Sequence, residues 1–251
     1  MILTIDTGNT RTKWAIFAAE GTIQTTGFCL NADLDDFEIP RDWQACKQAI
    51  VANVAGQLIA QKLEALLLKA NIPFSFAYAQ ALSCGLKNQY ETPSQLGVDR
   101  WAAMVAAYKR YANQPACLVV NVGTALTIDS LFQDTFLGGL IVPGLHMMQS
   151  ALVQKTDAVN PTHGQRQILP RNTADASYSG IIMAMVGAIV MQADQLESRC
   201  QDVPSIVMTG GDAPLLLPIL TPILTPIFGV KPVFVEGLVL EGLYLMGSEL
   251  V

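Results

Sequence analysis

The sequence feature that most constrains the fold is a diverged internal repeat. Residues 2–17 and residues 118–132 each read as an apolar strand, a tight turn that contains glycine, and a second strand rich in β-branched residues. Asp6 aligns with Asn121, and the glycines that follow two residues later align at the same offset. A chain that carries this unit twice is predicted to form two similar halves.

Each copy is followed by a similar series of elements. Third strands are expected at 22–28 and 135–142, helices at 57–70, 95–111 and 177–196, and short strands at 49–54, 74–78 and 205–208. This order predicts an α/β protein made of two duplicated ribonuclease-H-like domains with a cleft between them. We place the border near Ala112–Pro115, which gives domains 1–114 and 115–251.

The composition is apolar, with 51% hydrophobic and 14% charged residues, and a membrane protein has to be considered. The longest apolar run, Ile181 to Met191, is about half as long as the roughly 20 residues that a membrane span needs. The segment 214–228 has a proline at every fourth position, which favours short broken turns over a span. We therefore expect no transmembrane segment.

Charge and cysteine usage exclude several further classes. The five cysteines are widely spaced and form no C-x-x-C pair, and His146 and His163 have no metal-ligand spacing. No basic segment precedes an apolar run at the start, so no signal peptide is expected. A net charge of −6 without a Lys/Arg cluster is a poor match for nucleic acid. We expect a cytoplasmic protein with reduced thiols that binds neither zinc, nucleic acid nor membrane.

The first turn has the residue types of a phosphate site, in the sequence Asp6-Thr7-Gly8-Asn9-Thr10-Arg11-Thr12-Lys13. Gly8 lets the backbone turn closely, so several N–H groups and the polar side chains beside it can meet phosphate oxygens. Asp6 can hold Mg²⁺ directly or through water, and Lys13 would add positive charge. The local pattern alone is equally compatible with an ordinary hairpin, and no Walker A sequence occurs.

The second copy repeats the turn as Gly123-Thr124-Ala125, with a hydroxyl available for the terminal phosphates. A third segment, Thr209-Gly210-Gly211-Asp212, follows a short strand and leads into a predicted helix. Two phosphate turns followed by a T-G-G turn resemble the plan of the acetate kinase, sugar kinase, Hsp70 and actin superfamily. The resemblance implies that ATP binds in the cleft, with its adenosine part against the glycine backbone.

Asp99 and Arg100 are adjacent at the start of an apolar helix, in the sequence Gly97-Val98-Asp99-Arg100. A carboxylate in this position can accept a hydroxyl proton, and a guanidinium can clamp a substrate carboxylate through two hydrogen bonds. The alternative is structural, with Asp99 interacting with the helix dipole and Arg100 lying as a solvated charge on the surface.

The motifs occur in the order of a type III pantothenate kinase, which the chain resembles over nearly its whole length. The resemblance is carried by Asp6–Lys13, Gly97–Arg100, Gly123–Ala125, Gly138–Gly144 and Thr209–Asp212. It implies phosphorylation of pantothenate by ATP, the first step of coenzyme A biosynthesis, with Asp99 as the base that activates the primary hydroxyl. It implies that residues 6–13 and Thr124 bind ATP with Mg²⁺. The pantothenate pocket would be lined by Tyr90, Gly97, Val98, Asp99, Arg100 and Thr173.

Asn121 departs from the family pattern, which usually has aspartate at this position. In the family this carboxylate binds a monovalent cation, potassium or ammonium, and the uncharged amide of Asn121 would hold such an ion more weakly. The family also forms homodimers. The apolar helices at 101–108 and 181–191 favour a large hydrophobic dimer interface, the alternative being helices buried inside one subunit.

Two other functions stay open on the sequence alone. The first is a small-sugar kinase of the same fold, although a sugar would offer Arg100 no carboxylate to bind. The second is a non-catalytic regulatory accessory protein, although such a protein would not need Asp6, Lys13 and Asp99 together.

Overall fold

The computed structural model of the chain describes residues 1–111, 113–156, 159 and 163–249. It forms two compact units. The first comprises Met1–Arg110, Asp134–Phe136 and Gly237–Val251, and the second comprises Tyr111–Gln133 and Leu137–Glu236. The chain passes from the first unit to the second after residues 110 and 136, and it returns after residues 133 and 236. Ala112, at the start of the expected border, lies outside the described residues.

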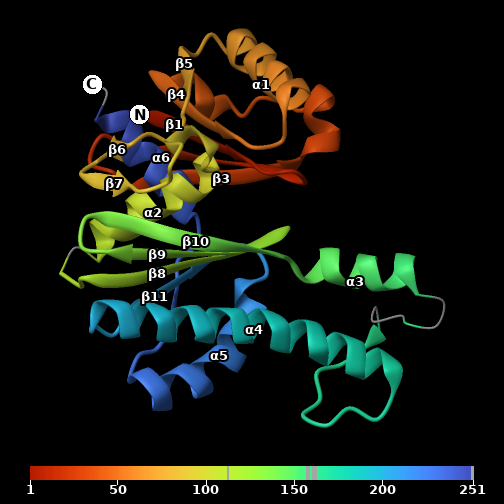
Figure 1. Cartoon of the computed structure of the whole chain (residues 1–251). Coiled ribbons are helices and arrows are strands. Elements are labelled where there is room, and N and C mark those ends of the chain that lie inside the picture. The colour runs from red at the N-terminus through yellow and green to blue at the C-terminus, as the bar shows by residue number, and fades with distance from the viewer. Residues whose placement is uncertain (112, 157–158, 160–162, 250–251) are drawn as a thin grey trace. The chain divides into compact units, whose positions relative to one another are not determined.

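The first unit is built on a five-stranded sheet of order β3-β2-β1-β4-β5 (Figure 1). Its strands are β1 (Ile2–Thr7), β2 (Arg11–Phe17), β3 (Ile23–Leu30), β4 (Gln48–Asn53) and β5 (Phe74–Phe76). The first three form an antiparallel meander, and β4 and β5 continue from β1 in parallel. The strand that carries Asp6 is therefore the centre of the sheet.

The second sheet has seven strands, and the five of them that follow the order β10-β9-β8-β11-β12 repeat this topology in the second unit. Its strands are β8 (Ala116–Val122), β9 (Ala125–Phe132), β10 (Thr135–Pro143), β11 (Ser205–Thr209) and β12 (Val233–Phe234). The central β8 pairs antiparallel with β9 and parallel with β11, as β1 does with β2 and β4. Asn121 on β8 thus occupies the position that Asp6 has on β1. The predicted α/β fold with two duplicated halves is confirmed.

Helices cover both faces of the first sheet. The helix α1 (Gln57–Lys69) packs on the face that carries Leu3 and Ile5, and α6 (Leu238–Ser248) packs on the face that carries Ala15 and Phe17. The helix α2 (Val98–Arg110) lies against α6, where a Cβ at Gly242 would collide with the carbonyl group of Ala102. Close backbone contact with α6 therefore buries the apolar side chains of α2 within the chain.

The C-terminal helix α6 thus belongs to the first unit, whereas the sequence grouped all residues after 114 in one domain. The packing of α6 against β1 and α2 explains this return of the chain. Two short strands, β6 (Leu82–Ser83) and β7 (Leu86–Asn88), also lie in the first unit, where β7 pairs with the first residues of β10. Short 3₁₀ helices occur at Asn31–Asp36, Arg41–Ala45 and Pro93–Gln95.

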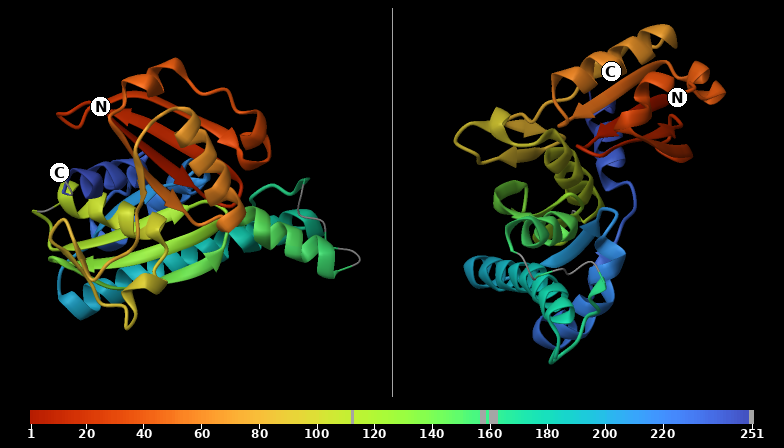
Figure 2. Two further views of the ribbon diagram at one scale, coloured as in Figure 1. Left: turned by 90° about the horizontal axis from the view of Figure 1, so that it is seen from above. Right: turned by 90° about the vertical axis from the view of Figure 1, so that its right-hand side faces the viewer.

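The second unit contains α3 (Leu145–Lys155), α4 (Thr173–Cys200) and α5 (Ala213–Phe228). Figures 1 and 2 show α4 and α5 on one face of its sheet, and both helices share a core cluster with β8, β9 and β11. By length and composition alone, α4 could cross a membrane, but a core helix meets the same criteria. Because its buried side chains pack into this cluster, α4 is a core helix of the second unit.

The prediction of broken turns at 214–228 is wrong, because α5 is one helix with three prolines inside it. Each internal proline removes a backbone hydrogen bond, which costs about 3 kcal/mol or more. The prolines are exposed, so water can hydrate the carbonyl groups that lose their donors. On the opposite side, Leu216, Leu220 and Leu224 are fully buried, and this burial offsets the cost.

Candidate active site

The turn between β1 and β2 is held by a chain of side-chain hydrogen bonds. The hydroxyl of Thr12 donates to Oδ1 of Asn31 (2.9 Å), and the hydroxyl of Thr7 lies 3.1 Å from that of Thr12. Asn31 in turn donates from Nδ2 to the carbonyl oxygen of Gly8 (2.7 Å), and the N–H of Gly8 donates to the carbonyl of Arg11 (3.1 Å). The turn is therefore a braced structure and not a loose hairpin.

The side chains of this turn divide into buried and exposed groups. Thr7 and Thr12 are buried and support the turn from within, whereas Asn9 and Thr10 are exposed at its tip. The Arg11 guanidinium lies over the ring of Phe28, 5.3 Å from its centroid. The tip thus presents polar side chains and backbone to solvent. Asn31 fixes the shape of the tip, although no sequence motif pointed to this residue.

Asp6 is half-buried at the end of β1, and its pKa is raised to about 7. The largest cause is desolvation, followed by repulsion from the carboxylate of Asp99, whereas Lys13 lowers the pKa. Asp6 and Asp99 are therefore near enough to interact electrostatically. Among the described residues no group of three or more His, Cys, Asp or Glu side chains could hold a metal alone. One carboxylate still fits Mg²⁺ that arrives with phosphates and keeps several waters.

Asp99 lies in the first turn of α2, directly after Gly97 and Val98. Its Oδ1 accepts a hydrogen bond from the N–H of Arg100 (2.8 Å). Desolvation raises the pKa of Asp99, while this hydrogen bond and the charge of Arg100 act to lower it. The carboxylate folds back over Gly97, where a Cβ atom would be only 2.7 Å from Oδ1. Gly97 is thus the residue that leaves room for this conformation.

Arg100 is only 5% exposed, so the alternative of a solvated surface charge is wrong. Its Nη1 donates a hydrogen bond to the hydroxyl of Tyr90 (3.2 Å), and its guanidinium carbon lies 5.9 Å from the centroid of the Tyr90 ring. The ring of Tyr90 packs in turn on Phe136, with centroids 5.3 Å apart. The first unit therefore brings together four of the predicted residues, namely Tyr90, Gly97, Asp99 and Arg100, and Val98 is buried beside them.

In the second unit, three glycine-containing segments meet at the turn after β8. The N–H of Gly144 donates to the carbonyl of Thr124 (3.0 Å), and that of Asp212 donates to the carbonyl of Val122 (3.0 Å). A Cβ at Gly144 or at Gly210 would collide with this turn, so both positions need glycine. The predicted Gly-Thr and T-G-G turns are thus in direct contact, with the Thr124 side chain exposed.

The two other predicted residues of the second unit lie at separate places. Asn121 is half-buried, with its Oδ1 beside Gly210, where a Cβ would be 2.6 Å away. Thr173 is the exposed first residue of α4 and follows the N-cap Asn172, whose Oδ1 accepts from the N–H of Asp175 (2.9 Å). Within the second unit, Asn121 therefore belongs to the glycine turns, whereas Thr173 belongs to the start of a long helix.

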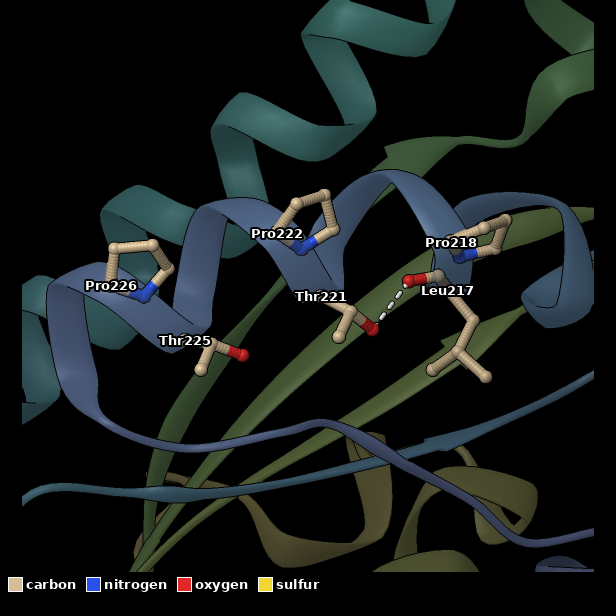
Figure 3. A pocket seen from close by; sticks show the side chains of 6 residues that line it. All are labelled: Leu217, Pro218, Thr221, Pro222, Thr225 and Pro226. Atoms are coloured by element: carbon tan, nitrogen blue, oxygen red, sulfur yellow. Dashed lines mark hydrogen bonds between the residues drawn. The ribbon is translucent and has the colours of Figure 1, made fainter.

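A surface pocket of about 710 Å³ lies along α5 (Figure 3). Its lining residues are Leu217, Pro218, Thr221, Pro222, Thr225 and Pro226. The two threonine hydroxyls donate to backbone carbonyls of Leu217 and Val230. Because this lining has no ionisable side chain, the pocket cannot supply a base or a clamp for a carboxylate, and we exclude it as the active site.

The fold defines the class of protein. A Campylobacter jejuni protein described as a Baf family transcriptional activator superimposes with a TM-score of 0.63 at 18% identity, over 98% of each chain. MreB 5 of Spiroplasma citri bound to AMPPNP superimposes with a TM-score of 0.51 at 8% identity, over 99% of this chain and 96% of that one. The chain therefore has the actin-like ATPase fold.

Sequence relatives narrow this class to one family. The family model described as type III pantothenate kinase matches residues 2–195. A type III pantothenate kinase of Methylobacillus flagellatus is 41% identical over 250 residues, which cover 98% of this chain and 97% of the relative. The chain belongs to the type III pantothenate kinase family, and the prediction of this family from the sequence is confirmed.

Proposed function

We propose that the chain transfers the γ-phosphoryl group of ATP to the primary hydroxyl of pantothenate, with Asp99 as the base and Arg100 as the carboxylate-binding residue. The family match and the near full-length relative confirm the predicted pantothenate kinase function. The observation that carries the residue assignments is the constellation of Asp99, Arg100 and Tyr90 at the start of α2. A sugar kinase would leave Arg100 without a substrate carboxylate to bind, and a non-catalytic regulatory protein would not need Asp99 as a base.

Asp99 has the properties that a base on the hydroxyl side needs. Its carboxylate is half-buried and its pKa is raised, so it binds a proton more readily than an ordinary aspartate. As the bond from the substrate oxygen to phosphorus forms, Asp99 takes the hydroxyl proton, and ADP leaves with the electrons of the broken phosphorus–oxygen bond. Most of the remaining rate acceleration in phosphoryl transfer comes from positioning and charge neutralisation.

Arg100 is suited to hold the carboxylate end of pantothenate. A guanidinium in a nearly water-free position binds a carboxylate more strongly than one at the surface, and its planar shape allows two parallel hydrogen bonds. Tyr90 would line the same pocket, because its hydroxyl already contacts Nη1 of Arg100. We assign Gly97 and Val98 to this pocket because they precede Asp99 in the chain. The assignment of Thr173 rests on the resemblance alone.

The phosphates of ATP would be held by the backbone N–H groups of residues 6–13 and by the polar side chains at the tip of this turn, and the hydroxyl of Thr124 would be a further donor. When bound, Mg²⁺ supplies positive charge to the phosphate oxygens, and Asp6 is the carboxylate that would hold it. The raised pKa of Asp6 supports this, because a cation would relieve both its desolvation and its repulsion from Asp99. A monovalent cation at Asn121 would be bound through an amide oxygen only, so we propose a weak requirement for potassium or ammonium.

We further propose a cytoplasmic homodimer that uses the exposed face of α4. This face presents Met183 and Met191, and the preceding loop presents Ile168 and Leu169, which are 88% and 82% exposed. Hydrogen bonds from the loop backbone to the side chains of α4 hold this loop in place. Sedimentation at sub-micromolar concentration tests the assembly, and a stable, fully active monomer would contradict it.

The function is tested by a coupled assay of ADP release with purified protein. Pantothenate should be phosphorylated in the presence of MgATP, and a panel of small sugars should give only background release. Rapid turnover of a sugar would favour the sugar kinase, and no turnover with any acceptor would favour the regulatory protein. Repeating the assay with and without K⁺ measures the contribution of the Asn121 site.

A further inference from the structure

Asn88 is a buried asparagine whose side chain joins three backbone segments of the first unit. It is the last residue of β7 and is 9% exposed. Its Oδ1 accepts a hydrogen bond from the N–H of Tyr90 (3.0 Å). Its Nδ2 donates to the carbonyl oxygens of Gln80 (3.2 Å) and Pro93 (3.5 Å). Both functional ends of the amide are therefore used, which neither a hydrophobic residue nor an aspartate could reproduce.

These bonds act on both sides of the contact between Tyr90 and Arg100. On one side, Asn88 fixes the backbone of Tyr90, two residues further along the chain. On the other side it holds Pro93, which begins the 3₁₀ helix that leads into α2 and so to Arg100. The backbone of Asn88 also pairs in register with Phe136, on which the ring of Tyr90 packs.

We propose that Asn88 is a positioning residue for pantothenate binding, which sets the placement of Tyr90 relative to the guanidinium of Arg100. The proposal rests on the proposed function, since it assigns this pair to the substrate carboxylate. Asn88 need not touch the substrate. Its effect is transmitted by the two backbone segments that its hydrogen bonds connect, because these segments carry Tyr90 and Arg100, the side chains proposed to contact the substrate.

The same unit contains a matched control. Asn31 is also 9% exposed, and it too uses both ends of its amide, but it braces the turn at Gly8 on the proposed ATP side. Asn31→Ala and Asn88→Ala therefore remove the same chemical group at equal burial. If each asparagine only stabilises the fold, the two variants should affect both substrates alike. If each positions its own segment, they should affect different substrates.

The experiment is steady-state kinetics on both variants, with each substrate varied in turn. Asn88→Ala should raise the KM for pantothenate about tenfold, the order expected when hydrogen bonding to a charged group is disturbed, and leave the KM for ATP within about twofold. Asn31→Ala should raise the KM for ATP and spare that for pantothenate. An unchanged pantothenate KM in folded Asn88→Ala, or equal changes in both constants, would overturn the proposal.

Two further variants keep the test decisive if Asn88→Ala folds poorly. In Asn88→Ser, the hydroxyl can still accept from the N–H of Tyr90, as serine does in turns, so its pantothenate KM should lie between those of wild type and alanine. In a double-mutant cycle, adding Asn88→Ala to Tyr90→Phe should raise the KM for pantothenate little further, since both changes weaken the same contact between Tyr90 and Arg100. Full additivity, or a serine variant as impaired as alanine, would count against Asn88 acting through Tyr90.

Failure of the proposed function can be told apart from failure of this inference. If the wild-type enzyme does not phosphorylate pantothenate, the proposed function is wrong. If it does and Asn88→Ala is normal, only the inference is wrong. Independently of turnover, a crystal structure of Asn88→Ala or Asn88→Ser should show the distance from Nη1 of Arg100 to the Tyr90 hydroxyl increased from 3.2 Å. An unchanged distance would overturn the positioning role.

Discussion

Replacing Gly97 by alanine should displace the proposed base without disturbing the fold. The added Cβ would lie 2.7 Å from Oδ1 of Asp99, closer than about 3.0 Å, below which real Cβ contacts essentially never occur. Gly97 has no left-handed backbone conformation, so alanine causes no backbone strain there. Because the obstructing atom belongs to a side chain, the carboxylate is expected to move away by a few tenths of an ångström.

The size of the effect follows from this displacement. Relief to between 3.0 and 3.4 Å requires a shift of about 0.3 to 0.7 Å. A misplacement of about 1 Å can cost about 10²-fold in rate. If the logarithm of the rate falls in proportion to the displacement, kcat should fall roughly 4- to 25-fold. The KM for ATP should hardly change, since Gly97 lies beside the proposed base and not in the phosphate turn.

The assay is ADP release at saturating substrates, together with a thermal melt that confirms folding. Asp99→Asn provides the reference, because removal of a general base typically lowers kcat about 10²- to 10⁴-fold. In the Asp99→Asn background, Gly97→Ala should have almost no further effect, since no base remains to be displaced. A normal kcat in folded Gly97→Ala, or an equal loss in both backgrounds, would refute the reasoning.

Three further predictions concern other parts of the molecule. Arg100→Ala should raise the KM for pantothenate far more than that for ATP, and pantothenol, which lacks the carboxylate, should distinguish the variant little from wild type; an unchanged pantothenate KM would remove Arg100 from the pocket. Because the folded pKa of Asp6 is raised to about 7 from an ordinary value of 3.8, the folded state binds more protons between these values, and stability should fall as pH rises from 4 to 7. Thermal melts should show a smaller fall for Asp6→Asn, although this variant should lose activity, and an identical pH profile would contradict the assignment. Pro222→Ala gives the carbonyl of Pro218 a donor within α5 and should raise Tm without changing kcat, whereas a lower Tm would show that the ring contributes more than the hydrogen bond.

Several features of the protein could be predicted from the sequence because they depend on short segments. The two strand-turn-strand units predicted the duplicated fold, since an apolar β-branched segment next to a glycine turn can adopt few local structures other than a hairpin. The adjacent Asp99 and Arg100 at the start of a helix could be selected as candidates in the same way, but their assignment as base and carboxylate-binding residue came from the family resemblance. The site residues themselves stay predictions, although four of them prove to be neighbours in the first unit.

Only the tertiary structure decided which elements complete each unit and which residues hold the site in shape. The helix α6 joins the first unit because Gly242 allows close contact with α2, and no local signal marks that partner. The prolines of α5 are tolerated because its leucines are buried on the other side. Asn31 and Asn88 are ordinary asparagines in the sequence. Their importance comes from burial beside backbone groups distant in the chain, because hydrogen bonds between such groups arise only when the whole unit is folded.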